Sequence, residues 1–200
     1  MHRFYKTISV ILHPLVVPTI GVILYFLIVP NTYDSNQKLA LLGLIFVTTY
    51  LVPTLILILF KKLKLINTFK TQNIEERKIP VALMVVVFYL LANTIASKTN
   101  MLDISLLFYA TSAALTFIYL CFAYQLKLSI HLLSLGISTS FFILLGFIYS
   151  YSFPTVVMIN ILLAGFVANA RLHLKAHTAK EVYLGFLVGF IAPFAVYSFL

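Results

Sequence analysis

Three polar residues in the last third of the chain have the types and the spacing for phosphoryl transfer. His177 and Glu181 are four residues apart, so on a helix they would share one face. A carboxylate beside an imidazole fixes its tautomer and raises its basicity. Arg171 precedes His177 by about one and a half turns, and a guanidinium binds phosphoryl oxygens through several donors. This cluster predicts a histidine nucleophile with a phosphate-binding cation beside it.

Two earlier clusters contain matching residue types. Lys70 and Arg77 lie seven positions apart in a basic stretch, and Ser129 and His131 stand at the start of a long apolar run. A second histidine can act as a general acid, and further cations can stabilise the charge of a phosphoryl group during transfer. We therefore expect both clusters to lie beside His177 in one site.

The remaining sequence predicts that membrane helices position these clusters. Of the 200 residues, 62% are hydrophobic and 10% are charged, whereas a soluble domain has about 25% charged residues. A helix needs about 20 apolar residues to cross a bilayer, and its backbone must form its hydrogen bonds internally. Seven stretches qualify: 8–29, 39–60, 80–97, 104–124, 130–149, 153–170 and 182–200. We expect an all-α polytopic transmembrane helix bundle of about seven spans, folded as one domain over residues 1–200.

Prolines modify several of these predicted helices. Pro14, Pro18 and Pro53 fall inside spans, where the missing N–H group and the ring kink a helix. Pro80 falls near a helix start, where proline fits well. His13 is an ionisable group at membrane depth, and we expect it to hydrogen-bond between helices.

Basic residues mark one face of the predicted bundle. Alternate connections put twelve lysines and arginines on the side with the three clusters and leave only Lys38 and Lys98 on the other. The positive-inside rule then puts the N-terminus and the clusters in the cytoplasm and the C-terminus outside, in a bacterial inner membrane. Short basic loops facing anionic headgroups account for the net charge of +9, which argues against a nucleic-acid partner.

The ordered set of clusters resembles the type 2 phosphatidic acid phosphatase superfamily of integral membrane enzymes. That superfamily shows K-x6-R-P, then P-S-G-H, then S-R-x5-H-x3-D. The residues that keep these spacings here, with glutamate for the final aspartate, are Lys70 and Arg77, Ser129 and His131, and Arg171, His177 and Glu181. The resemblance covers the chain from Lys70 onward and continues into the last predicted helix at Val182 and Gly185.

The resemblance implies a role for each matched residue. His177 would attack phosphorus and become a phosphohistidine, Glu181 would orient it, and His131 would protonate the leaving oxygen. The residues that would bind the phosphate oxygens are Lys70, Arg77, Ser129 and Arg171. The substrate implied is a lipid phosphate or diphosphate, held at the interface among membrane lipids. No metal or other cofactor is implied.

Four positions depart from the superfamily pattern. They replace the proline after the first arginine, the proline and glycine around the serine, and the serine before the last arginine, and they are Lys78, Leu128, Ile130 and Ala170. These departures leave catalysis open. They favour the alternative of a catalytically inactive membrane protein on the same scaffold, which binds lipid or assembles a membrane complex.

Two further alternatives use the same residues or their neighbours. His173, His177 and Glu181 recur every four residues, which on one continuous helix would suit a metal ion. The nearby cations Arg171, Lys175 and Lys180 oppose a divalent metal and favour an anion. A small transporter would have charged or unwound positions at mid-membrane, and only His13 suggests one. The identity of the lipid and the oligomeric state stay open.

Overall fold

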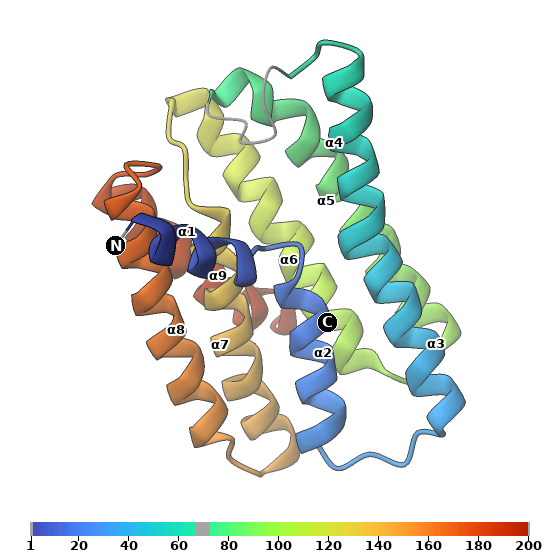
Figure 1. Cartoon of the computed structure of the whole chain (residues 1–200). Coiled ribbons are helices and arrows are strands. Elements are labelled where there is room, and N and C mark those ends of the chain that lie inside the picture. Colours follow the sequence, from blue (N-terminus) through green and yellow to red (C-terminus); the bar gives the residue numbers. More distant parts are fainter. Residues whose placement is uncertain (1, 67–72, 200) are drawn as a thin grey trace.

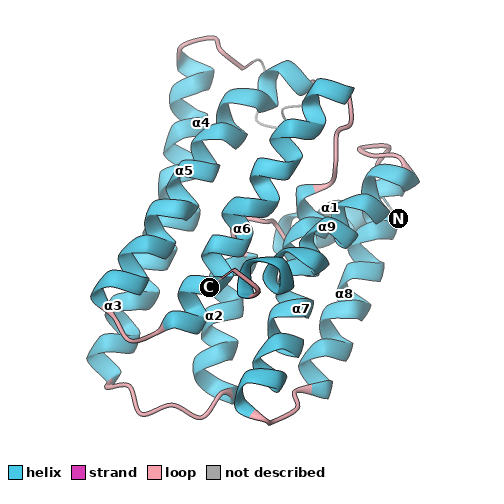
Figure 2. Ribbon diagram, turned by 180° about the vertical axis from the view of Figure 1, so that it is seen from behind, coloured by secondary structure: helices cyan, strands magenta, loops and turns pink. Residues whose placement is uncertain are grey.

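The computed structural model describes residues 2–66 and 73–199, and its regular structure within these ranges is entirely helical. The helices follow one another along the chain and pack into one bundle (Figures 1 and 2). Their bounds are α1 His2–Ile11, α2 Val17–Ile28, α3 Ser35–Phe46, α4 Val52–Lys62, α5 Ile74–Lys98, α6 Leu102–Cys121, α7 Ile130–Tyr149, α8 Pro154–His173 and α9 Ala179–Tyr197.

Six helical segments in the described residues are long and apolar enough to cross a membrane. They are Ser35–Lys62, which joins α3 and α4, and the helices α5, α6, α7, α8 and α9. Many of their large apolar side chains stay exposed, as expected where the surrounding solvent is hydrocarbon. The prediction of an all-α membrane bundle is therefore confirmed.

The first predicted span, 8–29, is divided in the structure. α1 ends at Ile11 and α2 begins at Val17, because Pro14 lacks an N–H group and its ring clashes with a preceding helical turn. α2 has 12 residues, so it rises about 18 Å and is shorter than the ~30 Å hydrocarbon core. α1 lies across the bundle, against α8, instead of continuing α2 (Figure 1).

A second proline widens a turn in the next span. Val47–Leu51 form a π-helical turn between α3 and α4, just before Pro53. Pro53 cannot donate to the carbonyl of Thr49, and the wider turn makes room for its ring. The buried Thr49 hydroxyl lies 3.3 Å from the hydroxyl of Thr19, which links this turn to α2.

Glycines bring α7 and α9 into close contact. A Cβ atom added at Gly185 would lie 2.7 Å from the carbonyl oxygen of Ser129, and one added at Gly189 would collide with the carbonyl of Leu133. Small residues of this kind let the backbones of membrane helices approach each other. From the first contact to the second, the position moves forward by four residues in α9 and by four residues in α7. The two helices therefore run in the same direction.

One carboxylate joins three helices at the far end of α7. The hydroxyls of Tyr25 in α2 and Tyr149 in α7 donate to Oδ2 of Asp103, at the start of α6, over 2.5 and 2.9 Å. Hydrogen bonds from two donors offset the cost of removing this carboxylate from water. This link fixes α2 along the bundle, with its first residues toward the start of α7.

We expect Gly189→Ala to destabilise the bundle, because the added methyl group would collide with the Leu133 carbonyl and force α7 and α9 apart. Overpacking of this kind costs about 1–3 kcal/mol. Gly165→Ala is the matched control, since nothing lies within 4 Å of its added Cβ atom. The control should leave stability unchanged or raise it by up to about 1 kcal/mol. Thermal unfolding in detergent compares the two variants, and equal midpoints would contradict the glycine contact.

Candidate functional site

The structure brings the predicted site residues together from four helix ends. Their positions are Arg77 in the first turn of α5, Ser129 and His131 at the start of α7, Arg171 in the last turn of α8, and His177 and Glu181 around the start of α9. Lys70 lies outside the described residues. Because α5 begins earlier and α8 ends later than their predicted spans, the two arginines belong to helices and not to loops, and Pro80 lies inside α5.

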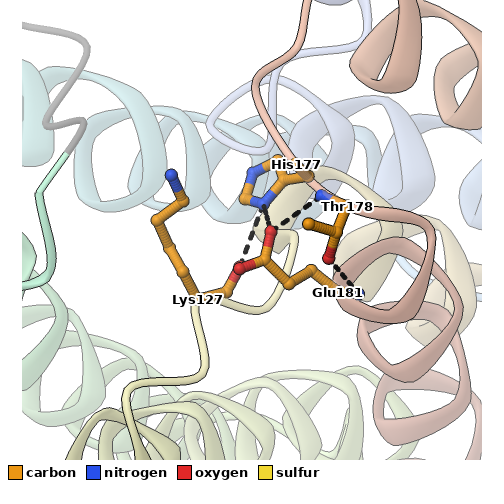
Figure 3. A network of polar contacts seen from close by, with 4 residues as sticks. All are labelled: Lys127, His177, Thr178 and Glu181. Atoms are coloured by element: carbon orange, nitrogen blue, oxygen red, sulfur yellow. Dashed lines mark hydrogen bonds and ion pairs between the residues drawn. The ribbon is translucent and has the colours of Figure 1, made fainter.

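His177 and Glu181 meet as predicted, but they do not share a helix. α8 ends at His173, and Thr178 is the N-cap residue of α9. The Thr178 hydroxyl accepts the N–H of Glu181 at 3.3 Å, and Oε2 of Glu181 accepts the N–H of Thr178 at 2.9 Å. This capping box turns the carboxylate back toward the preceding residue, so Oε2 also lies 3.2 Å from Nδ1 of His177 (Figure 3).

The contacts of Nδ1 define the tautomer of the His177 ring. Nδ1 lies 2.9 Å from the carbonyl oxygen of Lys127 and 3.2 Å from the Glu181 carboxylate (Figure 3). Both partners only accept hydrogen bonds, so Nδ1 carries the proton of the neutral ring. Nε2 then holds the lone pair and is the nitrogen that can attack an electrophile.

The surroundings of His177 keep its ring neutral. Burial and the guanidiniums of Arg77 and Arg171 lower the pKa of His177 to about 4, and the Glu181 carboxylate opposes them only in part. A neutral imidazole is nucleophilic at physiological pH, whereas a protonated one is not. The ring of His177 is therefore in the form that can attack an electrophile.

Cations exceed anions in this cluster. Arg77 is buried, and Arg171 is half-buried and donates from Nη1 to the hydroxyl of Ser9 over 2.9 Å. Two buried polar atoms of the cluster, Nε of Arg171 and the hydroxyl of Ser129, have no hydrogen-bond partner among the described residues. Buried donors and cations of this kind favour an anion with several acceptor oxygens. The arrangement can bind a phosphate group.

Sequence reasoning missed Ser9, which lies against both His131 and Arg171. Nε2 of His131 is 3.2 Å from the carbonyl oxygen of Ser9 and 3.4 Å from its hydroxyl. α1 carries Ser9 over the site, and Tyr5 of α1 packs on His173 with ring centroids 4.4 Å apart. The signal for this helix was present: polar and apolar residues recur along α1 with helical spacing, which is typical of an interfacial helix.

The polar cluster borders a cavity of about 770 Å³ inside the bundle. The polar residues at this end of the cavity include Ser9, His13, Arg77, Lys127, His131 and Arg171. His13 lies in the break between α1 and α2, and its ring lies 5.2 Å from the His131 ring, centroid to centroid. The His177 side chain is only 1% exposed and lies behind Lys127 and Ala176, which form the cavity wall.

The helix bounds contradict the geometry that the alternative metal site requires. Its three ligands would need one continuous helix, but α8 ends at His173 and His177 lies before α9. No group of three metal-binding side chains occurs among the residues that the structure describes. The positive charge around His177 also opposes a divalent cation.

Comparison of the chain with protein families, curated proteins and solved structures gives no match. Function therefore has to be inferred from the residues of this cluster and their geometry.

We expect acid to destabilise the protein through His177. The pKa of His177 is about 4 in the folded chain, below its ordinary value of 6.5. The unfolded chain therefore binds more protons between these values, and stability falls as the pH drops from about 6.5 to about 4. His177→Asn keeps a donor for the Lys127 carbonyl but takes up no proton, so its unfolding temperature should fall less over this range. Parallel curves of unfolding temperature against pH for the two proteins would contradict the lowered pKa.

Proposed function

We propose that this protein is a membrane lipid phosphatase or phosphotransferase that acts through His177. One arrangement carries the proposal: a neutral imidazole, held at Nδ1 by two acceptors, lies directly behind the wall of an intramembrane cavity whose polar end includes Arg77 and Arg171. Such a site combines a nucleophile with cations that stabilise phosphoryl charge. The substrate is a lipid phosphate or diphosphate, and the site needs no metal.

The proposed reaction has two steps. Nε2 of His177 attacks phosphorus while the bond to the leaving oxygen breaks, and His131, as the imidazolium ion that the negative charge of the bound phosphate stabilises, gives its proton to that oxygen. Water then attacks the phosphohistidine, His131 takes the proton of the water, and His177 leaves as the neutral ring. In a phosphotransferase, the hydroxyl of an acceptor replaces the water.

The remaining residues of the cluster bind the phosphoryl group or position His177. Arg77 and Arg171 hold the phosphoryl oxygens, and Ser129 and Lys70 are expected to assist. Glu181 is a positioning residue, because its carboxylate contacts His177 and the cap of α9. Its negative charge also stabilises the positive charge of the ring in the phosphohistidine.

Substrate entry requires α1 to shift. Ser9 contacts Nε2 of His131 and Nη1 of Arg171, which are the groups that the proposed reaction uses for the leaving oxygen and the phosphoryl oxygens. A phosphate group with its own acceptor oxygens can replace Ser9 at both contacts.

We further propose that the chain is a divergent member of the type 2 phosphatidic acid phosphatase superfamily. The described residues of the three motifs, with Arg77 alone representing the first, meet at one end of the bundle, and this supports the proposal because the superfamily reaction needs all three motifs together. Of the departures, Leu128 and Ala170 are fully buried. Their side chains therefore pack in the interior and leave the phosphate-binding role to the charged residues.

The motif residues also make contacts that stabilise the fold, and these contacts favour a second function. Glu181 caps α9, the N–H of Ser129 donates to the Glu181 carbonyl at 3.1 Å, and His131 contacts α1. A catalytically inactive scaffold that binds lipid or assembles a membrane complex would use these contacts for folding alone.

We expect the protein, purified in detergent, to release phosphate from lipid phosphates or diphosphates without added metal. His177→Ala should lower the rate by roughly a thousand-fold or more, because it removes the nucleophile. Lys180→Ala removes an exposed charge three residues away and is the matched control, which should keep its activity. An acid-labile phosphoprotein should form in the wild-type protein and not in His177→Ala.

The inactive scaffold predicts a different outcome of the same assay. If folded wild-type protein releases no more phosphate than His177→Ala on any of these lipids, the enzymatic function is wrong. Release that requires a divalent metal would contradict the proposed chemistry as well.

We propose that the site faces the cytoplasm in a bacterial inner membrane, with the N-terminus inside and the C-terminus outside. The basic residues on α1 and at the adjoining helix ends support this orientation. A reporter enzyme that works only outside the cytoplasm should therefore be active when fused to the C-terminus. Activity of a cytoplasmic reporter at the same position would reverse the orientation.

A further inference from the structure

The cavity of about 770 Å³ has two chemically different ends. One end borders the basic cluster described above. The other is enclosed by apolar side chains of α5, α6 and α7, among them Met84, Phe88, Leu107, Phe141 and Phe142. A cavity with a cationic end and an apolar end fits an amphiphile that has an anionic headgroup.

The depth of the cavity corresponds to one leaflet of a bilayer. On α7 the lining residues extend from Ile130 to Phe142, and on α5 from Arg77 to Phe88. These intervals are twelve and eleven helical steps, or about 16–18 Å. The hydrocarbon core of a bilayer is about 30 Å thick, so one leaflet measures about 15 Å. A hydrocarbon chain of ordinary length therefore fits along the cavity.

The wall formed by α2 is open at Gly21. This glycine is buried, yet nothing lies within 4 Å of a Cβ atom added to it. Gly165 in α8 also has nothing within 4 Å, but it is exposed on the outside of the bundle. The space beside Gly21 is therefore internal, and Gly21 lines both this cavity and a second one of about 660 Å³ between α2, α7 and α8.

We propose that the site selects lipid phosphates with a single hydrocarbon chain, and that this chain enters the cavity between α2, α5, α6 and α7. The inference rests on the proposed function for the headgroup, which the cationic end binds. The cavity volume lies within the range of about 300–1,000 Å³ that encloses one drug-sized ligand. This volume accommodates one chain with its headgroup and excludes a second chain.

Selection depends on shape and not on hydrophobic transfer. Bilayer hydrocarbon is as apolar as the cavity, so a chain gains little by leaving one for the other. Its binding must come from close packing against the aromatic lining and from the headgroup contacts. The second chain of a two-chain lipid cannot pack against this lining, so such a lipid would stay in the bilayer.

A tryptophan reporter can test the proposal without hydrolysis, because the protein has no tryptophan of its own. Phe142→Trp places the reporter at the cavity floor, and Phe166→Trp, on the exposed side of α8, is the matched control. The probes are non-hydrolysable phosphonates with a brominated chain, one with a single chain and one with two. We expect the single-chain probe to quench both reporters and the two-chain probe to quench only the control.

Two results of this experiment would overturn the proposal. Equal quenching of the Phe142→Trp reporter by both probes would show that the cavity does not distinguish one hydrocarbon chain from two. No quenching by either probe would show that no chain enters the cavity. Because phosphonates are not cleaved, a failure here is distinct from a failure of the phosphatase assay.

Filling the cavity gives an independent test in the reporter protein. Gly21→Phe should weaken binding of the single-chain probe by roughly ten-fold or more, whereas Gly165→Phe should leave binding unchanged. Thr111→Phe fills the cavity from α6 and should act like Gly21→Phe, so the test stands if one filled variant fails to fold. Unchanged binding in a folded filled variant would contradict the proposal.

Discussion

The close approach of α7 and α9 is the contact on which the candidate site depends. Because Gly185 and Gly189 have no side chain, the backbone of Ser129 reaches α9, and its N–H group donates to the carbonyl of Glu181 over 3.1 Å. This bond sets the start of α7 against the first turn of α9. His131 and the Glu181 carboxylate thereby belong to one rigid unit, although about fifty residues separate them in the chain.

The capping box of α9 lets one carboxylate serve both folding and chemistry. Oε2 of Glu181 satisfies a free N–H group at the helix start and contacts Nδ1 of His177. With the carboxylate fixed, the ring proton stays on Nδ1, and the two guanidiniums disfavour a second proton. Local helix capping thus prepares Nε2 as a nucleophile in a region where positive charge is in excess.

α1 connects this polar cluster to the membrane interface. Its interruption before α2 places Ser9 on the groups that would bind phosphate and leaves α2 beside the cavity. A continuous first span would have carried Ser9 away from α8. The helix break at Pro14 is therefore a local feature with a consequence for the whole site, because it decides both what covers the cations and how the cavity is closed.

The sequence alone determined the all-α membrane fold, since length and hydropathy suffice where every backbone group must bond within its own helix. It also determined that His177 and Glu181 would meet. The prediction that both residues lie on one helix is wrong, but an interval of four residues keeps them close in either case. Only the tertiary structure decided the position of Ser9 and the cavity between helices. These features depend on backbone approaches of a few ångströms between distant segments. Apolar periodicity cannot specify such approaches, because the helices that cross the membrane are apolar on most of their faces.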